Sequence, residues 1–402
     1  MSGITKQFLH KIYNGSTYIA TIDPFIVMNK PSFTWEINGG MGEMNIDLAL
    51  TLKEFGENYE GINIVFGYKV QTFVQGENEN AGTKIYEGLI TNYEPLIDKE
   101  GKEFIRVHIV SQMTTLANEL LKDGSNTEVA YSSQDPSVIL KDIIDKYNGA
   151  IDYTATSVKD TATTVSYTFT FTTYLEAIKK ILELCPAWWY WYIDASNTIY
   201  LAEKRSDADH KLYLGKEVVS INARKSIDEL KNVIYFKGGG NPPLYKKYTR
   251  TSSVLAFGTR EHRMSDERVT VAGTAETIAT KYLDEHDHPV SIISIEIIDD
   301  SADTTKGYDI ESIKVGDIVQ VLHPNYESKI TEWDVALWDV DFWDFDIRYS
   351  IGLPMQVKTI RYEYNSITLE LNMQAEDIAF RIEDINRNLD VVRSEGIPSV
   401  PS

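Results

Sequence analysis

The stretch from Val357 to Leu371, VKTIRYEYNSITLEL, most constrains how this chain can fold. Hydrophobic and polar residues alternate in both halves, which is the pattern of a β-strand with one buried face. Asn365-Ser366 separates the halves, and a two-residue connection that begins with Asn suits the positive φ angles of a tight turn. In that register Tyr362 faces Leu369, and each such pair stabilises a hairpin by roughly 0.2–1 kcal/mol. The stretch therefore predicts a half-buried antiparallel hairpin.

A second hairpin of related plan is predicted from Lys84 to Ser111. Its second half alternates Ile105, Val107 and Ile109 with polar residues, and its turn is Asp98–Gly101, where the glycine closes a longer loop. The first half alternates poorly, so we expect its residues to be covered on both faces. Two such hairpins, one near each end of the chain, predict two β-modules with a different segment between them.

That intervening segment, residues 122–210, has helix signals. Asp135 is placed to cap one helix, and Thr173 with Glu176 forms the capping box of another. Strand patterns surround both helices, including Trp189–Ile193. We therefore expect an insert of helices packed on a short sheet.

The predicted fold class is α+β and mainly β, with two related small β-barrel modules, an α+β insert between them and a C-terminal helix. The second module is expected to include a helix over 273–286 and a loop over 331–347. The predicted domains are residues 1–121 (first module), 122–210 (insert), 211–372 (second module) and 373–402 (helix and tail).

The predicted C-terminal helix carries a heptad seam. Its core positions follow one another at alternating spacings of four and three residues, and isoleucine at both kinds of core position favours three strands over two. A second interpretation, an amphipathic helix docked on its own domain, stays open. The trimer-helix candidates are Ile378, Ile382, Ile385, Leu389 and Val392.

An internal repeat lies in the predicted loop. Trp333, Trp338 and Trp343 are each followed by Asp, and the period of five matches neither helix nor strand. Exposed tryptophans between two strands indicate an anchor for a partner. The alternative is a loop that folds its tryptophans back onto the barrel.

Composition limits the possible functions. The chain has 402 residues and a formal net charge of −21, so we do not expect capture of nucleic acid by a basic face. Its only cysteine, Cys185, cannot form an internal disulfide and is predicted to be a packed core thiol. The first 18 residues lack the apolar region of a secretion signal, and no window predicts a membrane span.

No catalytic, cofactor-binding or metal-binding residue is predicted. His286 and His288 lack a third ligand nearby, and neither Gly39–Gly42 nor Gly238–Gly240 leads into a phosphate-binding loop. The aromatic run Trp188–Tyr192 fits a sugar platform, but in alternating strand text half of it must face inward, which favours core. A glycosidase carboxylate pair stays open, because distant partners leave no local pattern.

The order of these segments resembles the hub proteins of phage tails. That family includes the baseplate hub of contractile phages, the spike hub of type VI secretion and the tail-associated hub proteins of long-tailed phages. The resemblance covers residues 16–375 and rests on Ile85–Ile90, Asp135–Ser137, Thr173–Ile178, Ser226–Asn232 and Val315–Val319, followed by the closing hairpin.

The resemblance implies a homotrimeric, non-enzymatic protein of the virion, assembled in the host bacterial cytoplasm. Two β-modules per subunit would form a pseudo-sixfold ring. Its implied partners are a tail tube or distal tail protein, a tape-measure protein, a spike or fibre protein, and viral DNA that passes through the lumen without specific binding. A glycan-binding β-protein and a glycoside hydrolase are the alternative functions.

Overall fold

The computed structural model describes residues 7–61, 63–75, 82–214, 217–298, 308–323, 349–350, 354–363 and 366–372. Its helices and strands confirm the predicted α+β, mainly β fold class. Contacts divide the chain into two compact units. The first comprises Met1–Lys204, Glu229–His288 and Thr359–Asn365, and the second comprises Arg205–Asp228, Pro289–Lys358 and Ser366–Ser402.

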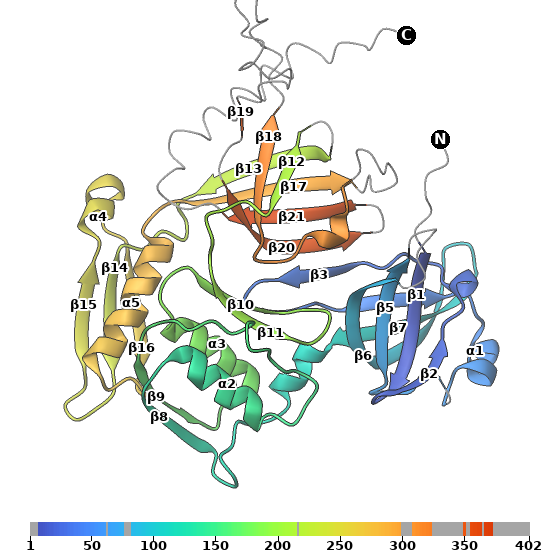
Figure 1. The fold of residues 1–402 in the computed structure, drawn as a ribbon, viewed down its shortest axis with the longest axis horizontal. Coiled ribbons are helices and arrows are strands. Elements are labelled where there is room, and N and C mark those ends of the chain that lie inside the picture. The colour runs from blue at the N-terminus through green and yellow to red at the C-terminus, as the bar shows by residue number, and fades with distance from the viewer. Residues whose placement is uncertain are drawn as a thin grey trace, which may run out of the picture. The chain divides into compact units, whose positions relative to one another are not determined.

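The first unit contains a six-stranded antiparallel sheet in the order β2-β1-β5-β6-β7-β4 (Figure 1). Between β4 and β5, a short helix, α1 (Leu52–Asn58), begins at a capping box of Thr51 and Glu54 that the sequence analysis did not identify. The strands are β1 (Gln7–Asn14), β2 (Thr17–Thr21), β4 (Met44–Leu48), β5 (Lys69–Gln75), β6 (Thr83–Ile97) and β7 (Glu103–Ser111).

The predicted upstream hairpin is the β6–β7 pair of this sheet. Ile105, Val107 and Ile109 of β7 are buried, as their alternation predicts. The turn closes through hydrogen bonds between Asp98 and its neighbours, with Gly101 at a φ of 83°. Residues 85–88 of β6 are all buried, so the predicted cover on both faces is confirmed for this part of the strand, whereas Thr91, Asn92 and Ile97 are exposed.

The second sheet follows the order β12-β18-β20-β21-β17-β13, and β19 also pairs with β18. Most of it belongs to the second unit, whereas the end of β20 belongs to the first unit and pairs there with β3 (Phe33–Glu36). The strands are β12 (His210–Tyr213), β13 (Val218–Ser226), β17 (Val290–Ile298), β18 (Ile318–His323), β19 (Tyr349–Ser350), β20 (Met355–Glu363) and β21 (Ser366–Asn372).

Strands β20 and β21 are neighbours in this sheet and correspond to the predicted downstream hairpin. Arg361 and Glu363 are exposed, whereas the alternate positions are buried, so the predicted half-buried ribbon is confirmed. Asn365, the first residue of the predicted turn, lies outside the described residues. The buried positions are Ile360, Tyr362, Ile367, Leu369 and Leu371.

Four strands have the same arrangement in both sheets. In the first, the order is β5-β6-β7-β4, and in the second it is β18-β20-β21-β17. Apart from the two-residue β19, each set places a hairpin beside the strand that precedes it in the chain. On the hairpin's other side lies the strand before that one, which is a Greek-key order. The outer strands differ, because β1 runs antiparallel to β5 whereas β12 runs parallel to β18.

The insert contains the two predicted helices. Asp135 caps α2 (Pro136–Lys146) through the amide of Ser137, and Thr173 with Glu176 forms the capping box of α3 (Tyr174–Leu184), as predicted. Two strand pairs accompany the helices. They are β8 (Glu128–Gln134) with β9 (Val165–Thr170), and β10 (Trp189–Ile193) with β11 (Ile199–Glu203).

A three-stranded sheet in the order β15-β14-β16 packs against a long helix, α5, as Figure 1 shows. α5 confirms the predicted helix over 273–286. A short helix, α4, follows β15. These elements are β14 (Val233–Gly238), β15 (Tyr245–Thr249), α4 (Thr251–Phe257), β16 (Glu261–Asp266) and α5 (Ala272–His286).

This small sheet shares its core with the insert. Ile234 and Phe236 belong to one buried cluster with residues of α2, α3 and α5. Asp266 lies 2.6 Å from the Lys180 ammonium and accepts a hydrogen bond from Tyr167. The predicted boundary at residue 211 placed Glu229–His288 in the second β-module, whereas these contacts group it with the first unit.

One buried polar pair lies inside the first sheet. His10 is 2% exposed, and its Nδ1 is 2.9 Å from the hydroxyl of Thr72, its partner across β1 and β5. Burial lowers the pKa of His10 to about 4, because the charged imidazolium would lose its hydration.

Among the described helices, none is both long enough and hydrophobic enough to cross a membrane.

We expect Gly88→Ala to destabilise the first unit by about 1–3 kcal/mol, because an added Cβ would lie 2.5 Å from the Val110 carbonyl oxygen. Chemical denaturation measures the loss. Gly39→Ala is the matched control, since its Cβ would have no neighbour closer than 3.7 Å. Equal stability of the two variants would contradict the close approach at Gly88.

We expect the stability of the protein to fall as the pH drops from about 6.5 to 4 through His10. In that window the unfolded chain binds a proton that the folded chain does not, which costs roughly 2 kcal/mol between pH 7 and pH 5. Denaturation at both pH values should show a smaller difference for His10→Gln. An equal difference in His10→Gln and in the unaltered chain would contradict this expectation.

Candidate interaction surface

Residues 231–270 carry eight Lys and Arg residues against three Asp and Glu residues, a local net charge of +5 in a chain of −21. The net charge of −21 for the whole chain conceals this segment, which was not predicted as a site. The available signal was the run YKKYT, residues 245–249, in which two lysines lie between two tyrosines. The segment forms β14, β15, α4 and β16.

Strand alternation separates the two faces of the β15-β14-β16 sheet. Ile234 and Phe236 of β14 are 0% and 2% exposed, and they face the core beside α5. Tyr235 between them is 42% exposed and is paired with Lys247 of β15 and Arg263 of β16. Successive side chains of a strand point to opposite faces of the sheet. The inner face packs in the core, and the outer face carries the polar side chains.

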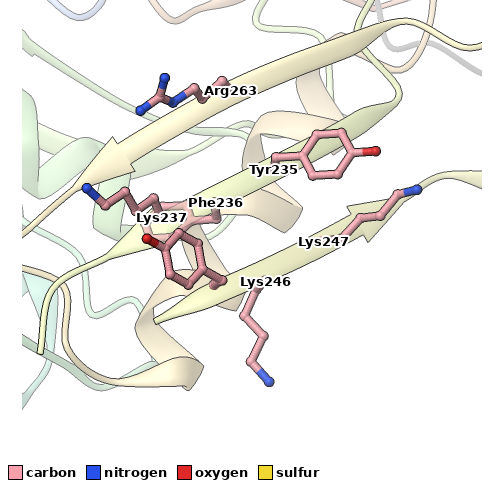
Figure 2. A pocket seen from close by; sticks show the side chains of 7 residues that line it. Tyr235, Phe236, Lys237, Lys246, Lys247 and Arg263 are labelled. Atoms are coloured by element: carbon pink, nitrogen blue, oxygen red, sulfur yellow. The ribbon is translucent and has the colours of Figure 1, made fainter. Parts of the chain in front are cut away.

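Figure 2 shows Arg263, Tyr235 and Lys247 on three adjacent strands. In the neighbouring row, Lys237 of β14 is paired with Tyr245 of β15, which is 66% exposed. We call these five residues, Tyr235, Lys237, Tyr245, Lys247 and Arg263, the basic face. They line a hollow of about 500 Å³ together with Phe236 and Lys246.

Contacts within the basic face hold some of its side chains in place. The Lys247 ammonium lies 5.2 Å from the centre of the Tyr235 ring, a cation–π distance. The Tyr235 hydroxyl donates a 3.1 Å hydrogen bond to Glu261, and the Lys237 ammonium is 3.9 Å from a Glu267 carboxylate oxygen. Glu267 is 81% exposed, so that ion pair is weak.

The basic face can therefore bind a ligand that offers carboxylates or phosphates together with flat rings. Lysine and arginine supply the charge, and the tyrosines supply apolar area with a polar tip.

The predicted site residues cannot be placed here. Trp333, Trp338 and Trp343 lie outside the described residues, and so do the trimer-helix candidates Ile378, Ile382, Ile385, Leu389 and Val392. The partner-docking role of the tryptophans and the trimeric role of the helix stay predictions.

The aromatic run Trp188–Tyr192 is mainly core. Trp189, Tyr190 and Trp191 are at most 8% exposed, and the Tyr192 ring stacks 4.6 Å from that of Tyr200. Cys185 is also buried, and burial raises the pKa of its thiol to about 12, as expected of a packed rather than a nucleophilic cysteine.

The histidines at the end of α5 have other contacts. The His286 ring stacks 4.0 Å from Tyr282, whose other face stacks 4.8 Å from His262 of β16. Burial and the charge of Lys231 lower the pKa of His262. In the part of the chain that the structure describes, no group of three or more His, Cys, Asp and Glu residues is arranged to hold a metal ion.

Comparison with known proteins identifies the fold. No family model and no curated protein matches the chain. The 43 kDa tail protein of prophage MuSo2 from Shewanella oneidensis has a TM-score of 0.59 at 12% identity, covering 92% of this chain and 99% of its own. The tail protein of Neisseria meningitidis MC58 has 0.56 at 9%, covering 91% and 96%.

Prophage tail protein gp18 from Listeria monocytogenes EGD-e has a TM-score of 0.53 at 13% identity and covers 95% of this chain and 99% of its own. At these identities the likeness shows the fold alone. This chain therefore has the fold of phage tail proteins, which confirms the resemblance at the level of fold.

We expect substitutions on the basic face to leave the stability of the protein nearly unchanged. A substitution at Phe236, which lies on the opposite, buried face of the same sheet, should destabilise it strongly. Tyr245→Ala should shift the free energy of unfolding by less than about 0.5 kcal/mol, and Phe236→Ala should cost about 3–5 kcal/mol. Chemical denaturation measures both. A large loss in Tyr245→Ala would mean that the tyrosine is structural.

Proposed function

We propose that this chain is a structural protein of a phage tail and forms the hub at the tail tip. The observation that carries the proposal is the repeated four-strand order in one chain whose fold matches tail proteins over more than nine-tenths of its length. A hub of this kind joins the tail tube or distal tail ring to a spike or fibre.

The repeated strand order supports a specific symmetry. A tube built with sixfold symmetry can be matched by three subunits if each contributes two similar modules, and closed rings of identical subunits are the usual form of soluble oligomers. We propose that the two sets of four strands, β5-β6-β7-β4 within residues 1–121 and β18-β20-β21-β17 within residues 211–372, are the centres of these modules. The predicted helix over 373–402 would continue the threefold axis toward the spike or fibre.

The acidic composition supports a passage for DNA. Like charges discourage phosphates from adhering to a wall, so a net charge of −21 suits a lumen through which viral DNA passes without specific binding. In this proposal the tape-measure protein occupies the same passage before ejection, and the protein acts in the virion after assembly in the host cytoplasm.

The proposed role is structural rather than enzymatic. Cys185 is buried in the core, and the His286 ring stacks on Tyr282, so both side chains have structural contacts. Sugar binding by Trp188–Tyr192 is not supported, because three of these five side chains are buried.

Purified protein should sediment as a trimer of about 137 kDa, three times the chain mass of 45.7 kDa. The double variant Ile382→Glu and Ile385→Glu, at two predicted seam residues, should weaken the trimer. Carboxylates at core positions of a three-stranded coil repel one another and lose their hydration. Analytical ultracentrifugation over a concentration series measures this.

Phe380→Glu is the matched control, because position 380 falls outside the predicted seam. It should leave the trimer intact. Electron microscopy of the trimer should show six similar densities around the axis. A monomer at every concentration, or three densities without pseudo-sixfold arrangement, would overturn the hub assignment.

A further inference from the structure

We propose that the basic face is a binding site for single-stranded nucleic acid. The face is the outer surface of the β15-β14-β16 sheet, where three cations and two exposed tyrosines lie together. In the part of the chain that the structure describes, Lys247 and Arg263 make no ion pair, and Lys237 has only its distant contact with Glu267. The charges of the face are therefore available to a ligand. This inference goes beyond the proposed tail function and does not depend on it.

Rings and cations alternate in both directions on the basic face. Every second residue of a strand points to the same side, so Tyr235 precedes Lys237 along β14. In the same way, Tyr245 precedes Lys247 along β15. Across the strands, Tyr235 is paired with Lys247, and in the next row Lys237 is paired with Tyr245. Each ring therefore has one cation about 6.6 Å along its own strand and another about 4.8 Å across the sheet.

A single strand of nucleic acid has the complementary alternation. Each nucleotide carries one phosphate and one flat base, so charges and rings follow one another along the polymer. The phosphates match the ammonium and guanidinium groups, and arginine can bind a phosphate through two parallel hydrogen bonds. The bases match the tyrosine rings, since proteins hold unpaired bases by stacking them on aromatic side chains. In a duplex the bases are stacked on one another, so the ligand expected here is single-stranded.

The sheet holds the basic face in one arrangement before any ligand binds. Phe236, on the inner side of β14, is buried in the core that includes α5. The Tyr235 hydroxyl donates a 3.1 Å hydrogen bond to Glu261, and the Lys247 ammonium lies 5.2 Å from the centre of the Tyr235 ring (Figure 2). Tyr245 is 66% exposed, so most of its side chain is open to a base. A rigid support lowers the entropy that binding costs.

The acidic remainder of the chain acts only weakly at this face. Outside residues 231–270 the net charge is −26, that is, −21 minus +5. At 0.1 M salt, charges further away than about 10 Å are largely screened, whereas bound phosphates lie in contact with the face. The charge of the whole chain predicted no capture of nucleic acid, and the pairing of three strands changes that prediction for one surface.

Two other roles of the basic face lead to different expectations. Lysines on an edge strand prevent pairing with other sheets, but Tyr235 and Lys237 lie on the central strand β14. An acidic polypeptide would also satisfy the cations, but its carboxylates would leave the two exposed rings without a partner. Nucleic acid is favoured because it accounts for both kinds of side chain.

Fluorescence anisotropy with the full chain tests the proposal. A fluorescein-labelled single strand of about 12 nucleotides is titrated with protein at about 50 to 200 mM salt. We expect saturable binding, with a slope of log K against log salt concentration of roughly −2, or −0.7 for each of three phosphate contacts. Lys247→Gln with Arg263→Gln should weaken binding at least 10-fold and reduce the slope to roughly −0.7. Unchanged affinity in this double variant overturns the proposal.

Matched variants separate a specific face from general charge attraction. The exposed pair Lys99→Gln with Lys102→Gln removes the same charge from the β6–β7 turn and should change the affinity less than twofold. Tyr245→Phe keeps the ring and should bind within twofold of the unaltered chain, whereas Tyr245→Leu should bind at least 5-fold more weakly. An equal loss in both lysine and lysine–arginine pairs, or equal affinity of Tyr245→Phe and Tyr245→Leu, contradicts the proposal.

Competition identifies the class of ligand. The unlabelled single strand should displace the probe, whereas a duplex of the same sequence and poly-glutamate of equal charge should each require at least 10-fold higher concentrations. Equal competition by poly-glutamate would assign the face to an acidic polypeptide instead, and equal competition by the duplex would show that bases are not bound. Either result overturns the proposal.

Photocross-linking tests the contact with the rings directly. A single strand that carries 5-iodouracil is irradiated in complex with the unaltered chain, and the linked peptides are identified by mass spectrometry. We expect cross-links to Tyr235 or Tyr245, because an excited iodouracil couples to an aromatic ring stacked on it. Cross-links found only outside residues 231–270 overturn the proposal.

Discussion

Both large sheets depend on the return of a distant strand to the side of a hairpin. In the first sheet β4 pairs with β7, from Met44↔Ile109 to Leu48↔Ile105, and Arg106 holds Asp47 through two hydrogen bonds. In the second, β17 pairs with β21 in the same way. A two-stranded hairpin alone is only marginally stable in water. The third and fourth strands extend each hairpin into a sheet whose hydrophobic face can be buried. This closing step gives both halves of the chain the same plan.

The insert is attached to β3, to the turn after it and to β6 of the first sheet through polar groups that strand patterns do not reveal. Trp35 donates from its indole nitrogen to the Ile193 carbonyl, and the Asn38 amide donates to Trp191. Glu87, 4% exposed, accepts from Asn197 of the insert. Burial alone would raise the Glu87 pKa, but hydrogen bonds from Lys84 and Gln71 and the lysine charges lower it. An ionised carboxylate is thus fixed between module and insert.

Local signals in the sequence predicted what local physics controls. The period of two gave the hairpins, and the caps at Asp135 and Thr173 gave both insert helices. Which strands pair depends on how distant parts of the chain come together. The alternation of hydrophobic and polar residues therefore predicted neither the β15-β14-β16 sheet nor the core that it shares with the insert. The basic face was missed for a related reason: a total charge of −21 averages over a segment of +5, and only the pairing of Tyr235 with Lys247 and Arg263 brings these residues together.

The two sets of four strands differ in one equivalent connection. The strand before the hairpin is joined to it by residues 76–82 in the first module and by residues 324–354 in the second, where the Trp-Asp repeat lies. If the hub is a trimer, a longer connection in only one of the two modules would divide six similar positions into two sets of three. In the proposed trimer, the shared strand order would meet a sixfold tube, whereas the Trp-Asp segments would occur three times. In that arrangement, the divergence of the modules would supply the threefold character that a spike or fibre requires, and the shared fold would supply the sixfold one.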